Sequence, residues 1–169
     1  MTAASAVLSS PAVVRVREAL NAAGSTAQIV ELPGAAKTAK AAAQYLGCEV
    51  GQIANSLVFR AMESGRAVLV MSSGAKRVDM ARLARIVGEP IGKADADFVK
   101  AATGFAIGGV APVGHSGQVL AFVESSLAAY PVLWAAAGHA NTVFSLTFPE
   151  LIRLTEGAQV DVAEQGAGG

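Results

Sequence analysis

Residues 57–71, LVFRAMESGRAVLVM, contain two apolar runs joined by the polar residues Glu-Ser-Gly-Arg. A short connection with a glycine between two apolar runs is typical of a β-hairpin. The runs, 57–62 and 67–71, are nearly continuous rather than alternating, which predicts strands buried on both faces. The core of the protein is therefore expected to form around a covered β-sheet.

Helices are predicted on either side of this hairpin, because capping residues precede apolar residues at helical spacing. Four of the five helices end at a glycine, which accepts the left-handed conformation of a helix C-terminus. The last begins with a capping box, a threonine followed three residues later by a glutamate, and runs through Leu154. The predicted caps are Ser10, Thr38, Asp79, Asp95 and Thr147, and the terminal glycines are Gly24, Gly47, Gly88 and Gly104.

Further strands are predicted at 26–32, 105–107, 119–123, 132–136 and 142–146. Helices do not separate the strands regularly, which argues against a doubly wound parallel sheet. We predict instead an α+β fold, with a mixed, curved or barrel-like central β-sheet and helices packed outside it. A single domain is expected over residues 10–159, between a flexible N-terminus at 1–9 and a frayed tail at 160–169.

Composition agrees with one globular domain and limits its partners. Of the 169 residues, 53% are hydrophobic and 15% are charged, which is apolar enough for a substantial core. The 13 basic and 13 acidic residues cancel. A protein that grips duplex nucleic acid through its phosphates usually carries a basic excess. Any nucleic-acid partner is therefore expected to be held transiently or at one end.

Cys48 is the only cysteine, which rules out an internal disulfide, a cysteine-rich zinc site and a CxxC redox pair. No stretch reaches the roughly 18 apolar residues that cross a bilayer. Residues 1–10 lack the basic start and apolar run of a signal peptide. We predict a cytoplasmic protein with no membrane partner.

Residues 108–114, GGVAPVG, form the most informative loop. Glycines let backbone approach a ligand closely, and Pro112 stiffens the turn. Exposed N–H groups in such a loop suit an oxyanion or a ribose oxygen. The alternative is a tight crossover between two strands, which composition alone favours, since loops rich in glycine and proline are common. The loop lacks the GxxxxGK[ST] pattern of a Walker phosphate loop.

Residues 138–142, GHANT, place His139 between two apolar strands. A histidine at a strand mouth can act as a base or hydrogen-bond donor near neutral pH, or it can be a turn residue without a role. The only other histidine, His115, lies in the glycine loop. Two histidines without a carboxylate cluster do not predict a metal site.

Lys76 and Arg77 precede a predicted helix that carries Arg82 and Arg85. Such a basic patch is usually a solvated face, and it is alternatively a contact for an RNA backbone.

Four segments together resemble the YbaK/ProX family of editing domains, which are related to the insertion domain of bacterial prolyl-tRNA synthetases. The segments are TAKAAAQYLG (38–47), IANSLVF (53–59), GGVAPVG (108–114) and GHANTVFSLTFPEL (138–151). The resemblance covers residues 24–155. It implies a barrel-like mixed sheet with surrounding helices. It also implies trans-editing, the hydrolysis of the ester that joins an amino acid to the terminal adenosine of a mischarged tRNA.

The resemblance assigns roles to individual residues. Asn55 and His139 are the predicted catalytic residues, and no metal or organic cofactor is expected. The basic patch, independently of the resemblance, makes Lys76 and Arg77 candidate tRNA contacts. The predicted partners are the acceptor end of an aminoacyl-tRNA, such as tRNA-Pro carrying a small amino acid, and an aminoacyl-tRNA synthetase. The predicted substrate-binding residues are Gly108, Gly109, Pro112, Gly114 and Asn141.

Asn55 departs from the family pattern, in which a lysine orients the substrate. A neutral amide stabilises a developing oxyanion less than a charged donor, by about 1–2 kcal/mol. Lys76 is a candidate source of the missing charge. The alternative reading is a homologue with little or no activity that binds tRNA, a nucleotide or a synthetase.

Overall fold

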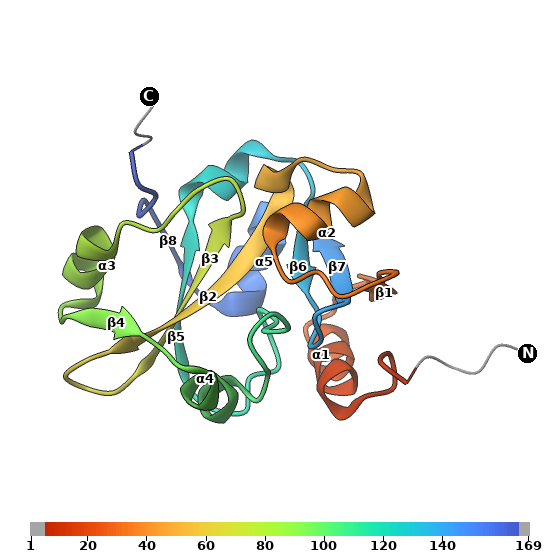
Figure 1. Ribbon diagram of the computed structural model, residues 1–169, viewed down its shortest axis with the longest axis horizontal. Helices are drawn as coiled ribbons and strands as arrows, with labels where there is room; N and C mark the ends of the chain where they lie inside the picture. The colour runs from red at the N-terminus through yellow and green to blue at the C-terminus, as the bar shows by residue number, and fades with distance from the viewer. Residues whose placement is uncertain (1–5, 166–169) are drawn as a thin grey trace, which may run out of the picture.

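The computed structural model describes residues 6–165, in which one mixed sheet of eight strands is covered by five α-helices (Figure 1). The helices are α1 (Pro11–Ala22), α2 (Ala39–Leu46), α3 (Met80–Val87), α4 (Ala96–Thr103) and α5 (Phe148–Thr155). The strands are β1 (Val30–Glu31), β2 (Ile53–Ala61), β3 (Ala67–Ser73), β4 (Ile91–Lys93), β5 (Val119–Glu124), β6 (Leu133–Ala136), β7 (Thr142–Leu146) and β8 (Ala158–Val160).

The strand order is β1-β7-β6-β2-β3-β5-β8, and β4 pairs with β2 off this path. The pairs β2–β6, β3–β5 and β5–β8 are parallel, whereas the other pairs are antiparallel. The predicted α+β fold with a mixed sheet is thus confirmed. The sheet stays open, because β1 and β8 lie at opposite ends of the path and are not paired with each other.

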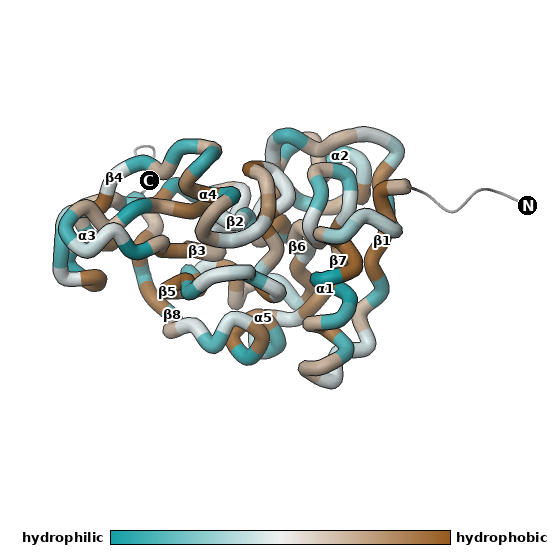
Figure 2. The backbone as a smooth tube through the Cα atoms, turned by 90° about the horizontal axis from the view of Figure 1, so that it is seen from below, coloured by the Kyte–Doolittle hydropathy of each residue, from teal (hydrophilic) through white to brown (hydrophobic). Residues whose placement is uncertain are grey.

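Helices cover both faces of the sheet. On one face, α1, α4 and α5 contribute Val16, Val99 and Leu151 to the largest core cluster. On the other face, α3 packs through Leu83 and α2 through small alanines. All seven residues of β3 are buried, so the prediction of a strand covered on both faces is confirmed for 67–71. It is wrong for 57–62, where Ala61 alone is buried and Arg60 and Met62 are exposed. Figure 2 shows the corresponding hydrophobic colour of β3 and β7 in the interior.

Local capping chemistry explains where the helices begin and end. The side chains of Thr38, Asp79, Asp95 and Thr147 accept hydrogen bonds from backbone N–H groups of the first helical turns. Ser10 precedes α1 but makes no such bond with its side chain, and Pro11 begins that helix instead. The glycines Gly47, Gly88 and Gly104 adopt positive φ at the ends of α2, α3 and α4.

Two predicted strands differ from the structure. The segment predicted as a strand at 26–32 contributes only Val30–Glu31, which pair with β7. Residues 105–107 form a bend and a turn rather than a strand. An apolar residue stands at position 105 because the Phe105 ring is fully buried in the core, not because the residue belongs to the sheet.

The predicted frayed tail at 160–169 is wrong for the residues that the structure describes. Val160 pairs with Glu124 at the end of β8. Val162 is fully buried, and its carbonyl accepts a 2.6 Å hydrogen bond from the N–H of Asp79. Apolar burial thus holds the chain through Ala163. Residues 166–169, like residues 1–5 of the predicted flexible N-terminus, lie outside the described residues.

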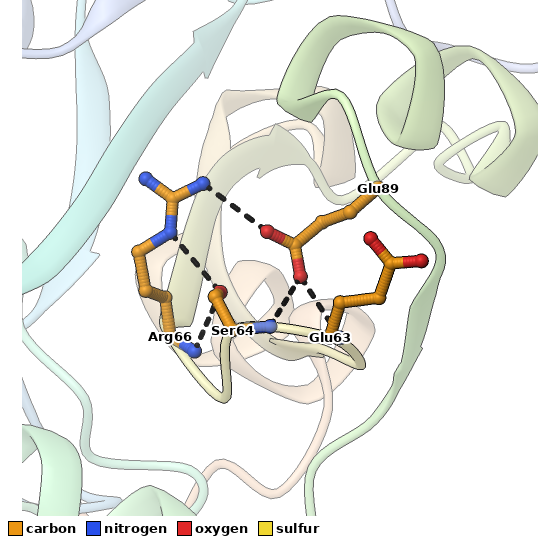
Figure 3. Close-up of polar contacts among 4 residues, drawn as sticks. All are labelled: Glu63, Ser64, Arg66 and Glu89. Carbon is orange, nitrogen blue, oxygen red and sulfur yellow. Dashed lines mark hydrogen bonds and ion pairs between the residues drawn. The ribbon is translucent and has the colours of Figure 1, made fainter.

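The predicted hairpin is formed by β2 and β3, and Glu89 fastens its turn (Figure 3). One oxygen of the Glu89 carboxylate accepts hydrogen bonds from the N–H groups of Glu63 (2.9 Å) and Ser64 (2.7 Å). The other oxygen lies 3.5 Å from the guanidinium of Arg66. The hydrogen bond from the Ser64 backbone is the main reason why the pKa of Glu89 falls below its ordinary value.

No helix within residues 6–165 is long and apolar enough to cross a membrane.

Candidate active site

The sheet has a gap beside β2. One edge of β2 pairs with β3 over most of its length. On the opposite edge, Ile53 and Ala54 pair with β6, and Phe59 to Ala61 pair with β4. Residues 55–58 therefore have no strand partner on that edge among the strands of the described chain.

Main-chain groups of β2 point into this gap. The N–H of Ala61 donates to Arg66 on the hairpin side, whereas the N–H of Met62 donates to Pro90 on the β4 side. Because backbone groups alternate in direction along an antiparallel strand, the N–H and C=O groups of Ser56 and Val58 face the gap. Unpaired backbone donors and acceptors thus line its floor.

A cavity of about 240 Å³ opens at the gap. The start of α2 and the residues before it form one wall, as Figure 1 shows for α2 above β2 and β6. The other walls come from β6, from the loop after it and from the glycine loop. Its polar and aromatic lining residues are Lys37, Thr38, Asn55, Ser56, Trp134 and Thr142.

A second cavity, of about 180 Å³, adjoins the first along β2. Both are lined by Ser56, Leu57, Ile107, Gly108 and Val110. Beyond this shared wall the second cavity is lined only by apolar side chains, Val58, Phe59, Ala94 and Val99. The gap therefore offers a compartment that contains several polar side chains and a smaller, mainly apolar one side by side.

Asn55 and Gly108, predicted from distant parts of the sequence, line the same cavity. Asn55 lies on the face of the sheet that α2 covers, because Ile53, two residues earlier, packs against that helix. Its register partner on β3 is Ser72, whose side chain is fully buried and whose hydroxyl has no hydrogen-bond partner. The structure thus places a neutral amide on the floor of the cavity.

The other predicted residues of the glycine loop support its shape rather than line either cavity. A Cβ on Gly109 would lie 2.9 Å from backbone atoms of Gly138 and His139, so the two loops are in close contact. Pro112 is buried. The carbonyl of Gly114 accepts a 2.7 Å hydrogen bond from Nε of Arg15 on α1. The loop is therefore fixed at both ends.

His139 and Asn141 lie on the loop between β6 and β7, of which Ala140 lines the cavity. His139 is exposed, and its N–H donates to the hydroxyl of Thr142 at 3.1 Å. The buried Oδ1 of Asn141 has no hydrogen-bond partner. Both residues are thus chain neighbours of a lining residue, but neither lines the cavity itself.

A family model for the aminoacyl-tRNA editing domain matches residues 33–154. The chain belongs to this family. The matched range contains β2, α2, the glycine loop and the loop after β6, which are the elements that enclose the cavity. The resemblance inferred from the four sequence segments is confirmed.

Individual proteins are similar to this chain. The editing domain is 44% identical to a protein whose crystal structure was described as that of a proposed trans-editing enzyme for prolyl tRNA synthetase. That match has a TM-score of 0.86 and covers 92% of this chain and 99% of the other. The crystal structure of hypothetical protein APE2540 is 26% identical, with a TM-score of 0.82 over 89% and 99% of the two chains. Uncharacterized protein YwhH of Bacillus subtilis strain 168 is 28% identical over 73% of this chain and 78% of its own.

Lys76 and Arg77 line neither of the two cavities beside β2. Both are exposed in the segment after β3, where the carbonyl of Arg77 accepts a hydrogen bond from the N–H of Glu164. The cation at the cavity is Lys37, which was not predicted from the sequence. The sequence feature that could have indicated Lys37 is its position, one residue before the matched segment that begins at Thr38.

Behind the glycine loop of the editing domain lies His115. Its Nε2 is 2.7 Å from the carbonyl oxygen of Ala111, and its ring contacts Phe105 edge to face. Burial is the main cause that lowers the pKa of His115, and the charge of Arg15 adds to it. Burial thus disfavours the charged form of this histidine, which acts as part of the support of the loop. Within residues 6–165, no three His, Cys, Asp or Glu side chains are grouped to hold a metal ion.

Proposed function

We propose that the protein is a trans-acting aminoacyl-tRNA deacylase, which hydrolyses the ester between a small amino acid and the terminal adenosine of a mischarged tRNA. The observation that carries the proposal is the cavity shared by Asn55 and Gly108 in a chain of the editing-domain family. Proline tRNA is the proposed acceptor, because the similar trans-editing protein was described in relation to prolyl tRNA synthetase. The proposal places the protein in the cytoplasm, where tRNAs are charged.

In this mechanism the cavity positions the ester and stabilises its transition state. The Asn55 amide donates a hydrogen bond to the ester carbonyl, and backbone N–H groups of Ser56 and the glycine loop stabilise the oxyanion that forms. Fixed backbone donors suit this task because they need little reorganisation during the reaction. Gly109 permits the close approach of the glycine loop to the loop that carries His139.

The described residues that line the larger cavity include no Asp, Glu or His. A lining side chain therefore does not serve as general base in this mechanism. Water, or water assisted by the vicinal ribose hydroxyl, attacks the carbonyl carbon. A new C–O bond forms, the bond to the ribose oxygen breaks, and that oxygen takes up the proton. The products are a free amino acid and uncharged tRNA. His139, beside the cavity, hydrogen-bonds the ribose.

A second candidate function is supported by the same lining. Asn55 is neutral, and a cavity without an ionisable base also suits a protein that binds tRNA, or a complex of tRNA and a synthetase, without cleaving it. The variant Asn55→Lys separates the two functions. A large gain of activity from near nothing identifies a binding protein that has lost its reaction.

Hydrolysis of Ala-, Ser- and Cys-charged tRNA-Pro by the purified protein tests the proposal. We expect release of at least one amino acid above the spontaneous rate. Asn55→Ala is expected to lower kcat by about 10²-fold, the effect of losing one oxyanion donor. His139→Ala is expected to reduce the rate as well, whereas Asn21→Ala, a change of an exposed asparagine on α1, leaves it unchanged. Spontaneous rates for all three substrates would refute the deacylase.

A further inference from the structure

Lys37 is the one charged side chain among the described residues that line the larger cavity. None of the ion pairs within residues 6–165 includes it. The residue is exposed although it contributes to the lining, which places it at the mouth of the cavity rather than in its interior. The cavity thus has at its opening a positive charge that takes part in none of these ion pairs.

We propose that Lys37 binds the phosphate on the 5′ side of the terminal adenosine of the aminoacyl-tRNA. This proposal rests on the proposed function. With the ester bound beside Asn55, the nearest negative charge of the substrate is this phosphodiester, one ribose away from the reacting carbon. A lysine ammonium is a compact, mobile point charge that suits a phosphate oxygen.

Exposure argues for the phosphate rather than the ester as the partner of Lys37. An ammonium is strongly hydrated, and moving it into the interior of a cavity costs free energy unless it is paired there. At the mouth of the cavity the ammonium of Lys37 remains hydrated, and the phosphate that it contacts is hydrated as well. The charged residue then determines where the acceptor end is held, while neutral groups inside the cavity contact the ester.

Other cations do not provide this contact. Lys40 is exposed on α2 but does not line the cavity, and Lys76 lines neither cavity. The net charge of the protein is +0, so its overall field does not attract phosphate. A single cation at the cavity mouth fits a partner that is gripped at one end.

Two substrates separate a phosphate contact from a contact with the ester. One is a tRNA that the wild type deacylates, and the other is the same amino acid esterified to adenosine, which carries no phosphate. Lys37→Gln is expected to raise KM for the tRNA about five- to tenfold, with kcat unchanged. It is expected to leave hydrolysis of the nucleoside ester unaffected. The dependence of log KM on log salt concentration should decrease by about 0.7 for the loss of one single-strand phosphate contact.

Lys40→Gln is the matched control, because it removes an exposed charge three residues away that does not line the cavity. Lys37→Arg retains the charge and is expected to retain most of the affinity. Equal losses on both substrates would overturn the proposal, because they would place Lys37 at the ester. An unchanged KM for the tRNA would also overturn it.

Failure of the proposed function is recognised separately, because the wild type then cleaves neither substrate. In that case binding of a CCA trinucleotide and of adenosine tests Lys37 directly. Lys37→Gln is then expected to weaken binding of the trinucleotide and to leave binding of adenosine unchanged. Equal affinity of the wild type and Lys37→Gln for the trinucleotide would overturn the proposed phosphate contact.

Discussion

At the scale of single residues, His115 makes the stability of the protein depend on pH. Its folded pKa lies below the ordinary value of 6.5. Between these two values the unfolded chain binds a proton that the folded chain does not, so the free energy of unfolding falls as the pH falls through this window. Above pH 6.5 the titration of His115 no longer lowers the free energy of unfolding.

The expected result is a lower urea midpoint at about pH 5.5 than at about pH 7.5, with a smaller difference in His115→Gln. The change in urea midpoint of His115→Gln between the two pH values contains the contribution of the carboxylates. Subtracting it from the change in the wild type leaves the contribution of His115. An identical pH dependence in the two proteins would show that His115 is not responsible.

Ser72 gives a second prediction at this scale. Its hydroxyl is fully buried without a partner, and such a group lowers stability relative to an apolar one of similar size. Ser72→Ala is therefore expected to leave the free energy of unfolding unchanged or to raise it by about 1 kcal/mol, measured by urea denaturation. A decrease of more than about 1 kcal/mol would mean that the hydroxyl is hydrogen-bonded in solution.

Individual site residues were predicted unevenly, for physical reasons. Asn55 and Gly108 were found because they stand within matched segments, and the structure brings both to one cavity. Lys37 was missed because an exposed lysine before a helix has no distinctive local pattern. Lys76 was considered for its charge, yet charge in a sequence does not reveal which end of a strand meets a cavity.

At the scale of elements, Glu89 links the β2–β3 turn to the segment that leads into β4 (Figure 3). Glu89→Ala is expected to lower the urea midpoint and to speed hydrogen exchange of the Glu63 and Ser64 amides, which lose their acceptor. Glu63→Ala is the control, because the Glu63 side chain takes no part in these contacts. Equal exchange rates in wild type and Glu89→Ala would contradict the assigned bonds.

The same contact predicts an acid effect. The folded pKa of Glu89 lies below the ordinary 4.5, so its contribution to stability is present above 4.5 and is lost as the pH falls through the folded pKa. The acid unfolding midpoint of Glu89→Ala should therefore lie at a higher pH than that of Glu63→Ala. Coincident midpoints would show that the carboxylate does not matter.

The contact between the glycine loop and the β6–β7 loop can be tested with Gly109→Ala. The added Cβ would meet backbone at 2.9 Å, which is expected to cost about 1–3 kcal/mol of stability and to displace the cavity wall. Gly157→Ala meets the carbonyl of Ala121 at the same distance, away from both cavities. Only Gly109→Ala should slow deacylation under conditions in which both variants remain folded. Equal deacylation rates of the two variants would show that this contact does not shape the site.

Helices were predictable in this chain because their signals are local. Thr38, Asp79, Asp95 and Thr147 cap the helices as expected, with the bonds inside a single turn. The short strands β4 and β8 were not predicted, because their formation depends on partners far away in the sequence. The apolar stretch at 105–107 was taken for a strand because burial in a core and burial in a sheet select the same residues.

At the scale of the whole molecule, the site is a consequence of sheet topology. β6 and β4 share one edge of β2 without meeting, and the cavities occupy the interval between them. The mixed fold was predictable from the order of apolar runs and helices. The gap was not, because the parallel pairing of β2 with β6 joins residues about 80 positions apart and follows from packing of the complete chain.

The most direct test of this account fills the larger cavity. Ala36 contributes to its lining, whereas its exposed neighbour Ala35 does not. The measurement is the single-turnover rate of deacylation of mischarged tRNA-Pro by the wild type, Ala36→Phe and Ala35→Phe. We predict that Ala36→Phe falls to the spontaneous rate while Ala35→Phe retains the wild-type rate. A folded Ala36→Phe variant that deacylates as fast as the wild type would contradict the claim that the ester is hydrolysed in this cavity.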